Sequence, residues 1–353
     1  MDHSDLISKE KELIEGEVSN FFRKERVSCI DDPLARQLLA SIEEYTLRDA
    51  KRVRSILVVM GYRSVGGADL EKARRAAVSL ELVQTMLLIH DDIMDRSDLR
   101  RGAPSFHVEY SSMHGELGYL GEPGQFGINM ALIAGDLAES LGEKALLESG
   151  FDKERIQEAL LSQTQMIRDT GFGQMFDLYS VELPKWSEAM VEKVHTLKTA
   201  RYTFDAPLRI GAHLHGASEQ QLNALSGYAL PVGVAFQIMD DILGFFGDPK
   251  RGGEIDLSDI KEGKRTLLIV KALEMVRDVE RDLIVGALGN KDLTVEEARK
   301  IRRIIKASGS EEYSRRKALE LTEKGLKALE GAELDPGIVS FLKAFAGYLV
   351  ERV

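Results

Sequence analysis

Two groups of paired aspartates, far apart in the chain, each follow an apolar stretch with helical spacing. Asp91, Asp92 and Asp95 occur in LLIHDDIMDRSD, and Asp240 and Asp241 occur in FQIMDDILGFF. Asp91 and Asp95 are one helical turn apart, so a helix places both carboxylates on one face, where like charges destabilise it. A divalent cation reverses the sign of that interaction, and Mg²⁺ takes oxygen ligands and bridges carboxylates to phosphates. The pattern therefore predicts magnesium binding.

A single cluster of this kind is equally typical of a solvated acidic helix face. The second cluster favours chemistry, because it repeats the arrangement at the end of another apolar helix. If the two helix ends face each other, metal ions can bind between them, with an apolar interior below. Such a site suits a ligand with an anionic head and an apolar tail.

The basic residues of this acidic chain gather in a few short segments. The sequence has 353 residues, with 47 Lys and Arg against 58 Asp and Glu and a net charge of −11. That acidic surplus disfavours a nucleic-acid-binding protein. Local cations still suit phosphate, Arg through paired hydrogen bonds and Lys as a point charge. The groups, which together predict two anion sites, are Lys51 with Arg54, Arg100 with Arg101, Lys198 beside Thr199, and Lys261 with Lys264 and Arg265.

The cysteine count and the hydropathy pattern bear on the compartment. Because the chain has a single cysteine, Cys29, a disulfide framework within one chain is excluded, and we expect the reducing cytoplasm. The N-terminal residues are charged throughout and lack the apolar stretch of a signal peptide. The longest uncharged run, 220–239, contains polar residues and leads into Asp240, so we expect a buried helix and no transmembrane segment.

Apolar residues recur at helical spacing along most of the chain, which predicts an all-α fold. Its length gives a soft expectation of two domains, but large helical folds hold as many residues in one, and we expect a single domain over 1–353. Two segments break the pattern, 108–127 and 247–259, and both are predicted to be loops. Helices are expected near 6–22, 36–60, 72–96, 129–148, 153–180, 188–215, 219–246, 264–287, 295–307, 311–330 and 337–351.

The motifs as a set resemble the trans-isoprenyl diphosphate synthases, the family of farnesyl and geranylgeranyl diphosphate synthases. Single members are weak signals, but their order and spacing match the family from about Lys51 to Lys264. The segments that carry the resemblance are KRVR at 51–54, DDIMDRSDLRRGAPSFH at 91–107, AGD at 134–136, GQMFDL at 173–178, KT at 198–199, FQIMDD at 236–241 and SDIKEGKRT at 258–266.

The resemblance implies a bundle of roughly ten or more helices around a central apolar cavity, and a homodimer. It also implies a reaction, in which isopentenyl diphosphate condenses head-to-tail with dimethylallyl, geranyl or farnesyl diphosphate after magnesium-assisted ionisation of the allylic substrate. Three Mg²⁺ ions are expected in each active site. The metal ligands would be Asp91 and Asp95, with Asp92 supporting them, and Asp240, with Asp241 nearby.

Further roles follow from the same resemblance. Arg100 and Lys198 would contact the allylic diphosphate, and together with Asp91, Asp95 and Asp240 they form the expected catalytic set. The remaining implied substrate-binding residues are Lys51, Arg54, Gln84 and Arg101 for isopentenyl diphosphate, Thr199, Tyr202 and Gln237 near the reacting carbons, and Lys264 closing over the site.

Product length is expected to depend on the fifth and fourth residues before the first aspartate, which form part of the cavity floor in this family. Here they are Met86 and Leu87, and neither is aromatic. Short-product enzymes often have aromatic residues there, so we expect an all-trans product of twenty carbons or somewhat longer, geranylgeranyl diphosphate in the first place. Both side chains are equally compatible with plain core packing.

The sequence departs from the family pattern in four places. Asp49 and Ala50 replace a common glycine pair, and Ser55 replaces a common proline. Gly244 stands in place of the third aspartate of the second cluster. Glu254 stands where a lysine usually contacts the allylic diphosphate, so Lys250 or Arg251 is expected to substitute.

Two alternatives remain open at this point. A class I terpene cyclase shares the first acidic cluster and the helical fold, but it needs only one diphosphate site, and Lys51, Arg54 and Arg101 argue against it. A non-catalytic subunit of a heteromeric synthase is the other, and the two intact aspartate clusters argue against that.

Overall fold

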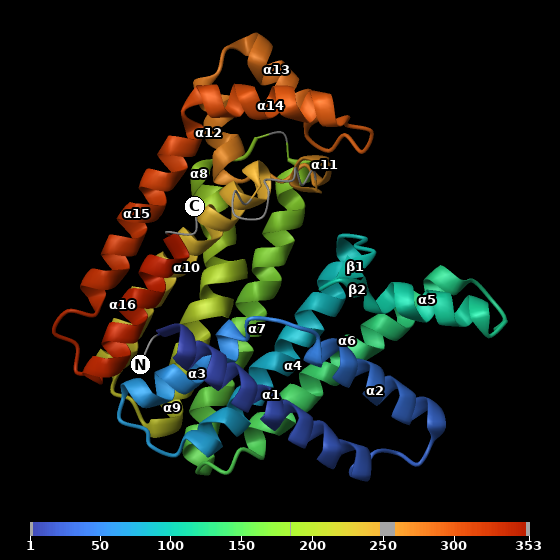
Figure 1. Ribbon diagram of the computed structural model, residues 1–353, viewed down its shortest axis with the longest axis vertical. Helices are drawn as coiled ribbons and strands as arrows, with labels where there is room; N and C mark the ends of the chain where they lie inside the picture. The colour runs from blue at the N-terminus through green and yellow to red at the C-terminus, as the bar shows by residue number, and fades with distance from the viewer. Residues whose placement is uncertain (1–2, 184, 248–257, 351–353) are drawn as a thin grey trace. The chain divides into compact units, whose positions relative to one another are not determined.

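A computed structural model describes residues 3–183, 185–247 and 258–350, and it is almost entirely helical (Figure 1). This confirms the predicted all-α class. Within the described residues, one short hairpin interrupts the helices, where β1 (Leu99–Arg100) pairs antiparallel with β2 (Ala103–Pro104). The helices divide between two compact units, and the single domain expected over 1–353 stays a prediction.

The first unit comprises residues 1–160 and 210–216. Its central helix is α4, which packs against α6, α3 and α1. Small residues allow this close packing, since Ala73, Ala76 and Ala77 on α4 and Ala131 and Ala138 on α6 are all fully buried. The helices of this unit are α1 (His3–Ser28), α2 (Pro33–Leu47), α3 (Val53–Ser64), α4 (Leu70–Met94), α5 (Phe106–Glu116), α6 (Pro123–Leu147) and the second half of α9 (Ala206–His215).

The second unit comprises residues 161–209 and 217–353, and α10 is its central helix. It begins at a capping box formed by Ser218 and Gln221, and it packs against α15 and η1. This unit contains most of α7 (Lys153–Glu182) and the first part of α9. Its other helices are α8 (Glu188–Val194), the π-helix η1 (His195–Asp205), α10 (Glu219–Phe246), α11 (Ser258–Glu262), α12 (Leu267–Met275), α13 (Asp278–Ala287), α14 (Val295–Ser308), α15 (Ser310–Ala328) and α16 (Pro336–Val350).

One helix among the described residues, α10, is long and apolar enough to cross a membrane. More than half of its most apolar stretch is buried inside the protein, and its last turns carry Asp240 and Asp241. These features are those of a core helix, as the sequence predicted for this segment.

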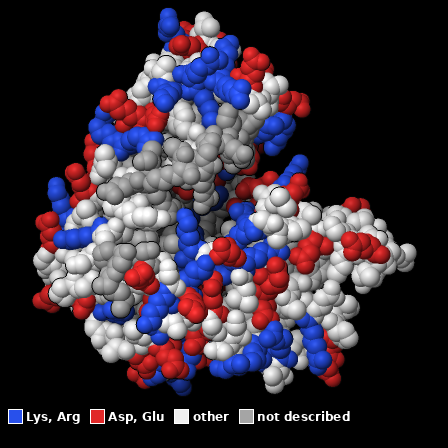
Figure 2. All heavy atoms as spheres, in the orientation of Figure 1, with Lys and Arg blue, Asp and Glu red and all other residues white. Residues whose placement is uncertain are grey.

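Charged side chains cover the visible face of the protein, with both signs interspersed (Figure 2). Lys and Arg gather over α13 and α14 in this view, although the chain as a whole is acidic. Arg299 and Arg303 of α14 line a shallow surface hollow there.

The expected helix 36–60 is wrong as a single element, because it is two helices with a loop between them. α2 ends at Leu47 and α3 begins at Val53. Arg52 lies between them in the left-handed region, with φ of 51°, where the helical conformation is interrupted. The expected helix 264–287 is likewise divided, because the backbone is extended at Val276 between α12 and α13.

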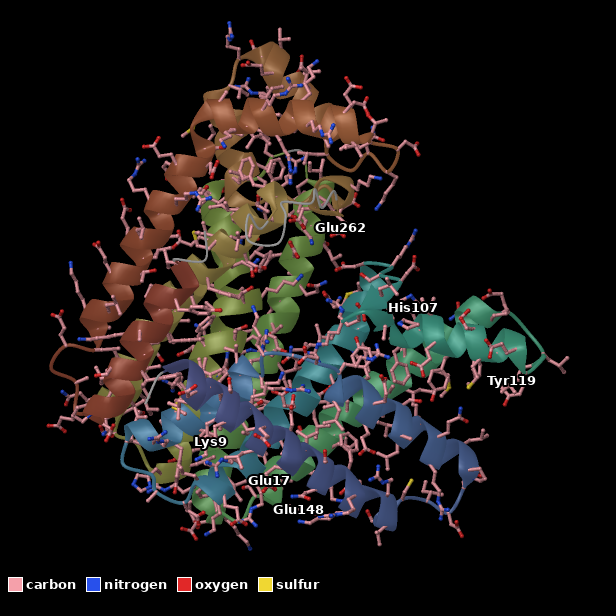
Figure 3. The ribbon with its side chains drawn as sticks, in the orientation of Figure 1. Lys9, Glu17, His107, Tyr119, Glu148 and Glu262 are labelled. Carbon is pink, nitrogen blue, oxygen red and sulfur yellow. The ribbon has the colours of Figure 1, made fainter. Side chains whose placement is uncertain are left out.

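The predicted loop 108–127 is also wrong, because most of it is helical. α5 extends to Glu116 and α6 begins at Pro123, so the connection is short; His107 lies at the start of α5 and Tyr119 lies beyond its end (Figure 3). The glycines that suggested a loop partly serve packing. A Cβ on Gly127 would overlap the carbonyl oxygen of His107, so glycine lets α6 approach α5 closely. Phe106, Tyr110 and His114 form the buried stripe of α5.

The second predicted loop, 247–259, is described only at its ends. α10 is followed by Gly247, and α11 begins at Ser258. Lys250, Arg251 and Glu254, on which the question of a substitute cation depends, lie outside the described residues.

Candidate active site

The first acidic cluster occupies the C-terminal end of α4 in the first unit. Asp91 and Asp92 belong to the last turn, and Asp95 is the C-cap residue, whose backbone N–H donates to the carbonyl of Asp91. The C-terminal end of a helix carries partial negative charge, which disfavours carboxylates and favours cations. An accumulation of carboxylates at this position is therefore unfavourable unless cations bind there.

Asp92 differs from its neighbours, because both of its carboxylate oxygens bind partners inside the protein. The side chain is fully buried, the Tyr45 hydroxyl donates to Oδ2 at 2.7 Å, and Arg100 Nε donates to Oδ1 at 2.7 Å. Burial and the contact with Asp92 raise the pKa of Tyr45, so this hydroxyl stays protonated and donates. Asp92 thus orients Arg100, whose Nη2 lies 3.7 Å from Asp91. Asp91 and Asp95 are partly exposed, and their role as metal ligands stays a prediction.

A group of cations lies beside this helix in the same unit. Gln84, on α4, has Arg54 Nη1 and Arg101 Nη2 at 3.3 and 3.2 Å from its amide oxygen, in the amide orientation that satisfies both donors. Burial lowers the pKa of Arg101, and the nearby Arg52 lowers it further. Crowded, partly buried cations of this kind repel one another, and an anion that binds among them lowers their electrostatic free energy.

The second acidic cluster borders a cavity of about 320 Å³ in the second unit. The cavity lies between α7, η1, α10 and the α11–α12 segment, and its polar lining comes from all four. The charged and polar lining residues are Asp177, Ser180, His195, Lys198, Thr199, Gln237, Asp240, Asp241, Asp259, Lys264, Arg265 and Thr266.

Lys198 and Thr199 belong to the π-helix η1, which neighbouring helices approach very closely. A Cβ on Gly173 of α7 would stand 2.5 Å from the backbone nitrogen of Lys198, and one on Gly233 of α10 would stand 2.6 Å from Cα of Ala200. Both glycines are therefore required for this packing. π-Helical turns are rare and occur frequently at functional sites.

A chain of polar contacts links η1 to the acidic end of α10. Thr199 Oγ1 donates to Gln237 Oε1 at 2.8 Å, and Gln237 Nε2 donates to Asp241 Oδ1 at 2.7 Å. The other oxygen of Asp241 lies 3.1 Å from His195 Nε2. Asp241 is thereby held in place, while Asp240 is exposed.

Two lysines of the cavity are paired with carboxylates. Lys198 Nζ donates to Asp177 at 2.7 Å, and Lys264 Nζ donates to Asp259 at 3.0 Å and lies 2.8 Å from Glu262, at the end of α11 (Figure 3). Burial alone lowers the pKa of Lys264, but Asp259 and Glu262 outweigh it and raise that pKa. Lys264 therefore remains charged, and both lysines are held by carboxylates beside the cavity.

Gly244, where the family pattern often has a third aspartate, makes room for a different carboxylate. A Cβ at this position would lie 2.9 Å from Oδ2 of Asp259, so a side chain there would displace Asp259 from the cavity. Burial raises the pKa of Asp259, and the charge of Asp241 raises it too, although Lys264 opposes both. A carboxylate from a later segment thus enters the space beside the second cluster.

Sequence reasoning missed three residues of these sites, Tyr45, His195 and Asp259. Two of them could have been found from the sequence, because they lie close to predicted site residues. Asp259 lies five residues before Lys264, and His195 lies three residues before Lys198. Tyr45 had no such signal, because it reaches Asp92 from another helix. Of the residues expected near the substrate chain, Tyr202 and Met86 are buried and Leu87 is partly exposed.

The donor set of both clusters fits Mg²⁺, which takes oxygen ligands. Among the described residues, no group of three or more ligating side chains closes a metal site by itself. That is the arrangement expected for Mg²⁺, which is usually bound by one or two carboxylates, together with waters and phosphate oxygens of the substrate.

Comparison with known proteins places these motifs in one family. Residues 36–305 match the model of the family described as polyprenyl synthetase. The geranylgeranyl diphosphate synthase of Sulfolobus acidocaldarius is 34% identical over 279 residues, 78% of each chain. The short chain isoprenyl diphosphate synthase of Methanothermobacter thermautotrophicus is 32% identical over 354 residues, 100% of this chain and 99% of the relative.

A solved structure is similar over nearly the whole chain. It is the geranylgeranyl pyrophosphate synthase of Corynebacterium glutamicum in complex with isoprenyl diphosphate and magnesium, at 32% identity and a TM-score of 0.91, covering 98% of this chain and 99% of that one. A family match over most of the chain, agreement with relatives above 30% identity, and the two acidic helix ends lead to one conclusion: the chain belongs to the polyprenyl synthetase family and is a trans-prenyltransferase.

Proposed function

We propose that the chain condenses isopentenyl diphosphate head-to-tail with an allylic diphosphate and releases geranylgeranyl diphosphate as its main product. The observation that carries this proposal is the pairing of an acidic helix end with a separate group of cations, Arg54 and Arg101 around Gln84. A second anion site is what a two-substrate reaction needs. The names of the relatives, which include geranylgeranyl diphosphate synthases, support the product class.

Asp91, Asp95 and Asp240 would hold magnesium together with the allylic diphosphate, and we propose three ions, as the family resemblance implies. When bound, Mg²⁺ stabilises negative charge that develops on the diphosphate as it leaves. The magnesium in the Corynebacterium complex supports the choice of metal. That both clusters bind the same substrate stays a prediction.

Arg100 and Lys198 would contact the same diphosphate. Each is held by a carboxylate, Arg100 by Asp92 and Lys198 by Asp177, so each cation is fixed before the reaction starts. Preorganised charge of this kind stabilises the transition state without the free-energy cost of reorganisation. A charge pair at 4 Å contributes about 4 kcal/mol at an effective dielectric constant of about 20.

The proposed reaction breaks one carbon–oxygen bond and forms one carbon–carbon bond. The C1–O bond of the allylic substrate breaks, and its electron pair leaves with diphosphate, giving a delocalised carbocation. The double bond of isopentenyl diphosphate attacks C1, and a proton is then lost to the departed diphosphate. Lys51, Arg54, Gln84 and Arg101 would hold the diphosphate of the second substrate during these steps.

The interior near the reacting carbons is proposed to include Thr199, Tyr202 and Gln237. Thr199 and Gln237 are hydrogen-bonded to each other, and Gln237 also donates to Asp241, so both polar side chains are held in place. Lys264, already held by Asp259, would close over the bound diphosphate.

Product length is proposed to depend on α4 one to two turns before Asp91. Met86 is 4% exposed and Leu87 is partly exposed, so Leu87 has more surface for contact with a growing chain. Neither is aromatic, which leaves more room below the cluster than a phenylalanine would. We therefore propose a product of twenty carbons or somewhat more.

We further propose a homodimer in the cytoplasm. α6 carries four large apolar side chains that are more than 40% exposed, Leu132, Ile133, Leu137 and Leu147. A stripe of this kind on one helix is typical of a face covered by another subunit. The single cysteine is compatible with a reducing compartment.

A product assay tests the proposed function. The purified protein is incubated with Mg²⁺ and dimethylallyl, geranyl or farnesyl diphosphate, each with and without isopentenyl diphosphate, and the products are separated by chromatography. We expect geranylgeranyl diphosphate, formed only when isopentenyl diphosphate is present. Hydrocarbon products without the second substrate would identify a cyclase instead. An inactive chain that stimulates another synthase would identify a non-catalytic subunit.

A further inference from the structure

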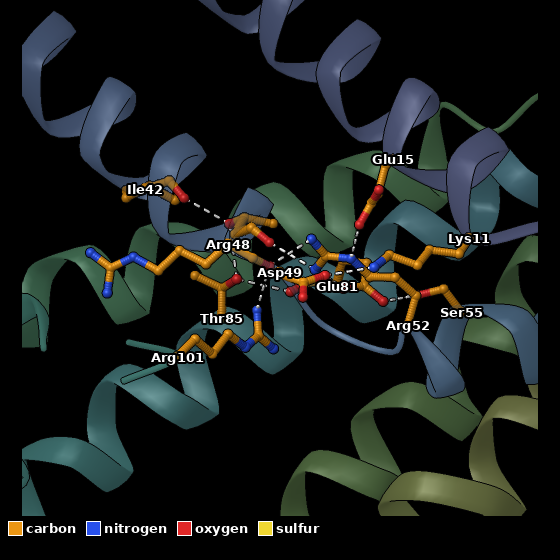
Figure 4. A network of polar contacts seen from close by, with 11 residues as sticks. Lys11, Glu15, Ile42, Arg48, Asp49, Arg52, Ser55, Glu81, Thr85 and Arg101 are labelled. Atoms are coloured by element: carbon orange, nitrogen blue, oxygen red, sulfur yellow. Dashed lines mark hydrogen bonds and ion pairs between the residues drawn. The ribbon is translucent and has the colours of Figure 1, made fainter. Parts of the chain in front are cut away.

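The loop between α2 and α3, residues 48–52, carries Lys51 and leads into Arg54. In this sequence the loop and its end depart from the family pattern, at Asp49, Ala50 and Ser55. Glycine allows a tight turn and proline stiffens one, so a loop without them needs other contacts to fix its conformation. A buried network of polar groups provides these contacts (Figure 4).

Arg52 is the centre of this network. Its side chain is 1% exposed and it donates to four groups, Glu81 Oε2 at 2.7 Å, the carbonyl of Thr46 at 2.8 Å, Glu15 Oε1 at 2.9 Å and the carbonyl of Arg48 at 3.0 Å. A left-handed φ in a side-chain-bearing residue is unfavourable and persists only where the surroundings enforce it. The four contacts of Arg52 are what enforce it here.

Two of the residues that depart from the family pattern make polar contacts next to Arg52, Ser55 in the buried network and Asp49 at the exposed surface. Ser55 Oγ donates to Oε1 of Glu81, the oxygen that Arg52 leaves available. Asp49 accepts from Lys11 of α1 at 2.6 Å. Side chains therefore tie the loop to α1, through Asp49 and Arg52, and to α4, through Glu81. Glycine and proline would instead act through the backbone.

The network reaches the cations that are proposed to bind isopentenyl diphosphate. The carbonyl oxygen of Arg48 accepts from Arg52 and also from Arg101 Nη1 at 3.4 Å (Figure 4). Glu81 lies one helical turn before Gln84, the amide that Arg54 and Arg101 share. Arg52 itself faces the interior, whereas Lys51 is exposed and Arg54 is partly exposed.

We infer that Arg52 is a positioning residue for isopentenyl diphosphate. It does not touch the substrate. It fixes the loop and the Arg48 carbonyl so that Lys51, Arg54 and Arg101 hold one geometry. This inference rests on the proposed function, since it concerns the second substrate of that reaction.

The test compares Arg52→Lys with a matched control, Arg74→Lys. Lysine keeps the charge beside Glu81 but lacks the planar fork needed to reach both carboxylates and both carbonyls. Arg74 makes a similar pair between α4 and α1, donating to Glu10 at 2.8 and 2.9 Å, but it lies outside the loop network. Steady-state kinetics with each substrate varied in turn are combined with calorimetric titration of isopentenyl diphosphate alone.

For Arg52→Lys we expect KM and Kd for isopentenyl diphosphate to rise about tenfold, with kcat and the KM for the allylic substrate within about threefold of the original protein. Arg74→Lys should leave all four constants unchanged even if it lowers the melting temperature equally. Equal effects of the two substitutions, an unchanged KM in Arg52→Lys, or a fall in kcat alone would overturn the inference.

Two further measurements keep the outcome decisive. If Arg52→Lys does not fold, Glu15→Ala replaces it, because Glu15 is partly exposed and its truncation removes only one contact of Arg52. A threefold rise in the KM for isopentenyl diphosphate supports the inference and no rise overturns it. The proposed function is judged separately, by whether the original protein forms the product, because the titration of isopentenyl diphosphate requires no turnover.

Discussion

The acidic ends of α4 and α10 look alike in the sequence but are stabilised in different ways. At α4, Asp92 is fully buried and is paired with the permanently charged Arg100. At α10, Asp241 accepts from the neutral amide of Gln237 and has His195 as its other partner. In each pair, one aspartate is committed to internal contacts and the other is more exposed.

This difference indicates a division of labour between the two clusters. In the first cluster, Arg100 of the same unit compensates the charge of Asp92 before any substrate binds. The second receives little permanent positive charge at Asp241, so more of its compensation must come from metal ions.

The largest effect on activity is expected when the more exposed aspartate of either cluster is replaced by the neutral asparagine. Asp91→Asn and Asp240→Asn should each lower kcat by about a thousandfold, because each loses a charge contact of about 4 kcal/mol. Steady-state kinetics over a range of Mg²⁺ concentrations measure this, and excess EDTA should abolish activity in the original protein. A loss below tenfold in either variant would contradict the assigned metal role.

Replacing the two aspartates that are bound inside the protein, Asp92 and Asp241, should lower the free energy of unfolding by different amounts. Asp92→Asn leaves the partly buried charge of Arg100 without its partner and should lower the free energy of unfolding by about 3 to 5 kcal/mol. Asp241→Asn keeps an acceptor for Gln237 and should lower it by about 1 kcal/mol. Urea unfolding of both variants measures the difference. Equal losses would remove the distinction between a charged and a neutral partner.

Tyr45→Phe isolates one hydrogen bond to Asp92 without changing charge. The buried Oδ2 loses its donor, which should lower the free energy of unfolding by about 1 to 3 kcal/mol. The KM for the allylic substrate should rise modestly, because Arg100 is less firmly oriented, while that for isopentenyl diphosphate stays constant. Chemical unfolding and kinetics on the same preparation check both, with Tyr110→Phe as a control for loss of a hydroxyl.

The smallest energetic effect is expected at the floor of the proposed cavity. Met86→Phe and Leu87→Phe add volume above the chain-end position and should shorten the main product, with little change in unfolding free energy for the partly exposed Leu87. Chromatography of the products measures the shift. A sole product of fifteen carbons from the original protein would refute the proposed role of these residues.

Most of the helices were predictable because their signal is local. The expected 219–246 coincides with α10, and 72–96, 295–307 and 337–351 differ from α4, α14 and α16 by a few residues. The failures share a cause, since 36–60 and 108–127 contain residues whose role depends on other parts of the chain. Arg52 breaks a helix through contacts with Glu15 and Glu81, and Gly127 allows a close approach to α5.

The sequence by itself determined the chemistry on offer, namely which carboxylates and cations exist and in what order, because residue type and spacing are local properties. Only the tertiary structure determined which of these side chains are already bound to other groups of the protein. Asp91 and Asp92 are neighbours of identical type, yet Tyr45 and Arg100 direct their hydrogen bonds to Asp92. Helix rotation turns adjacent side chains in different directions, and their partners come from distant segments, so no local pattern contains that information.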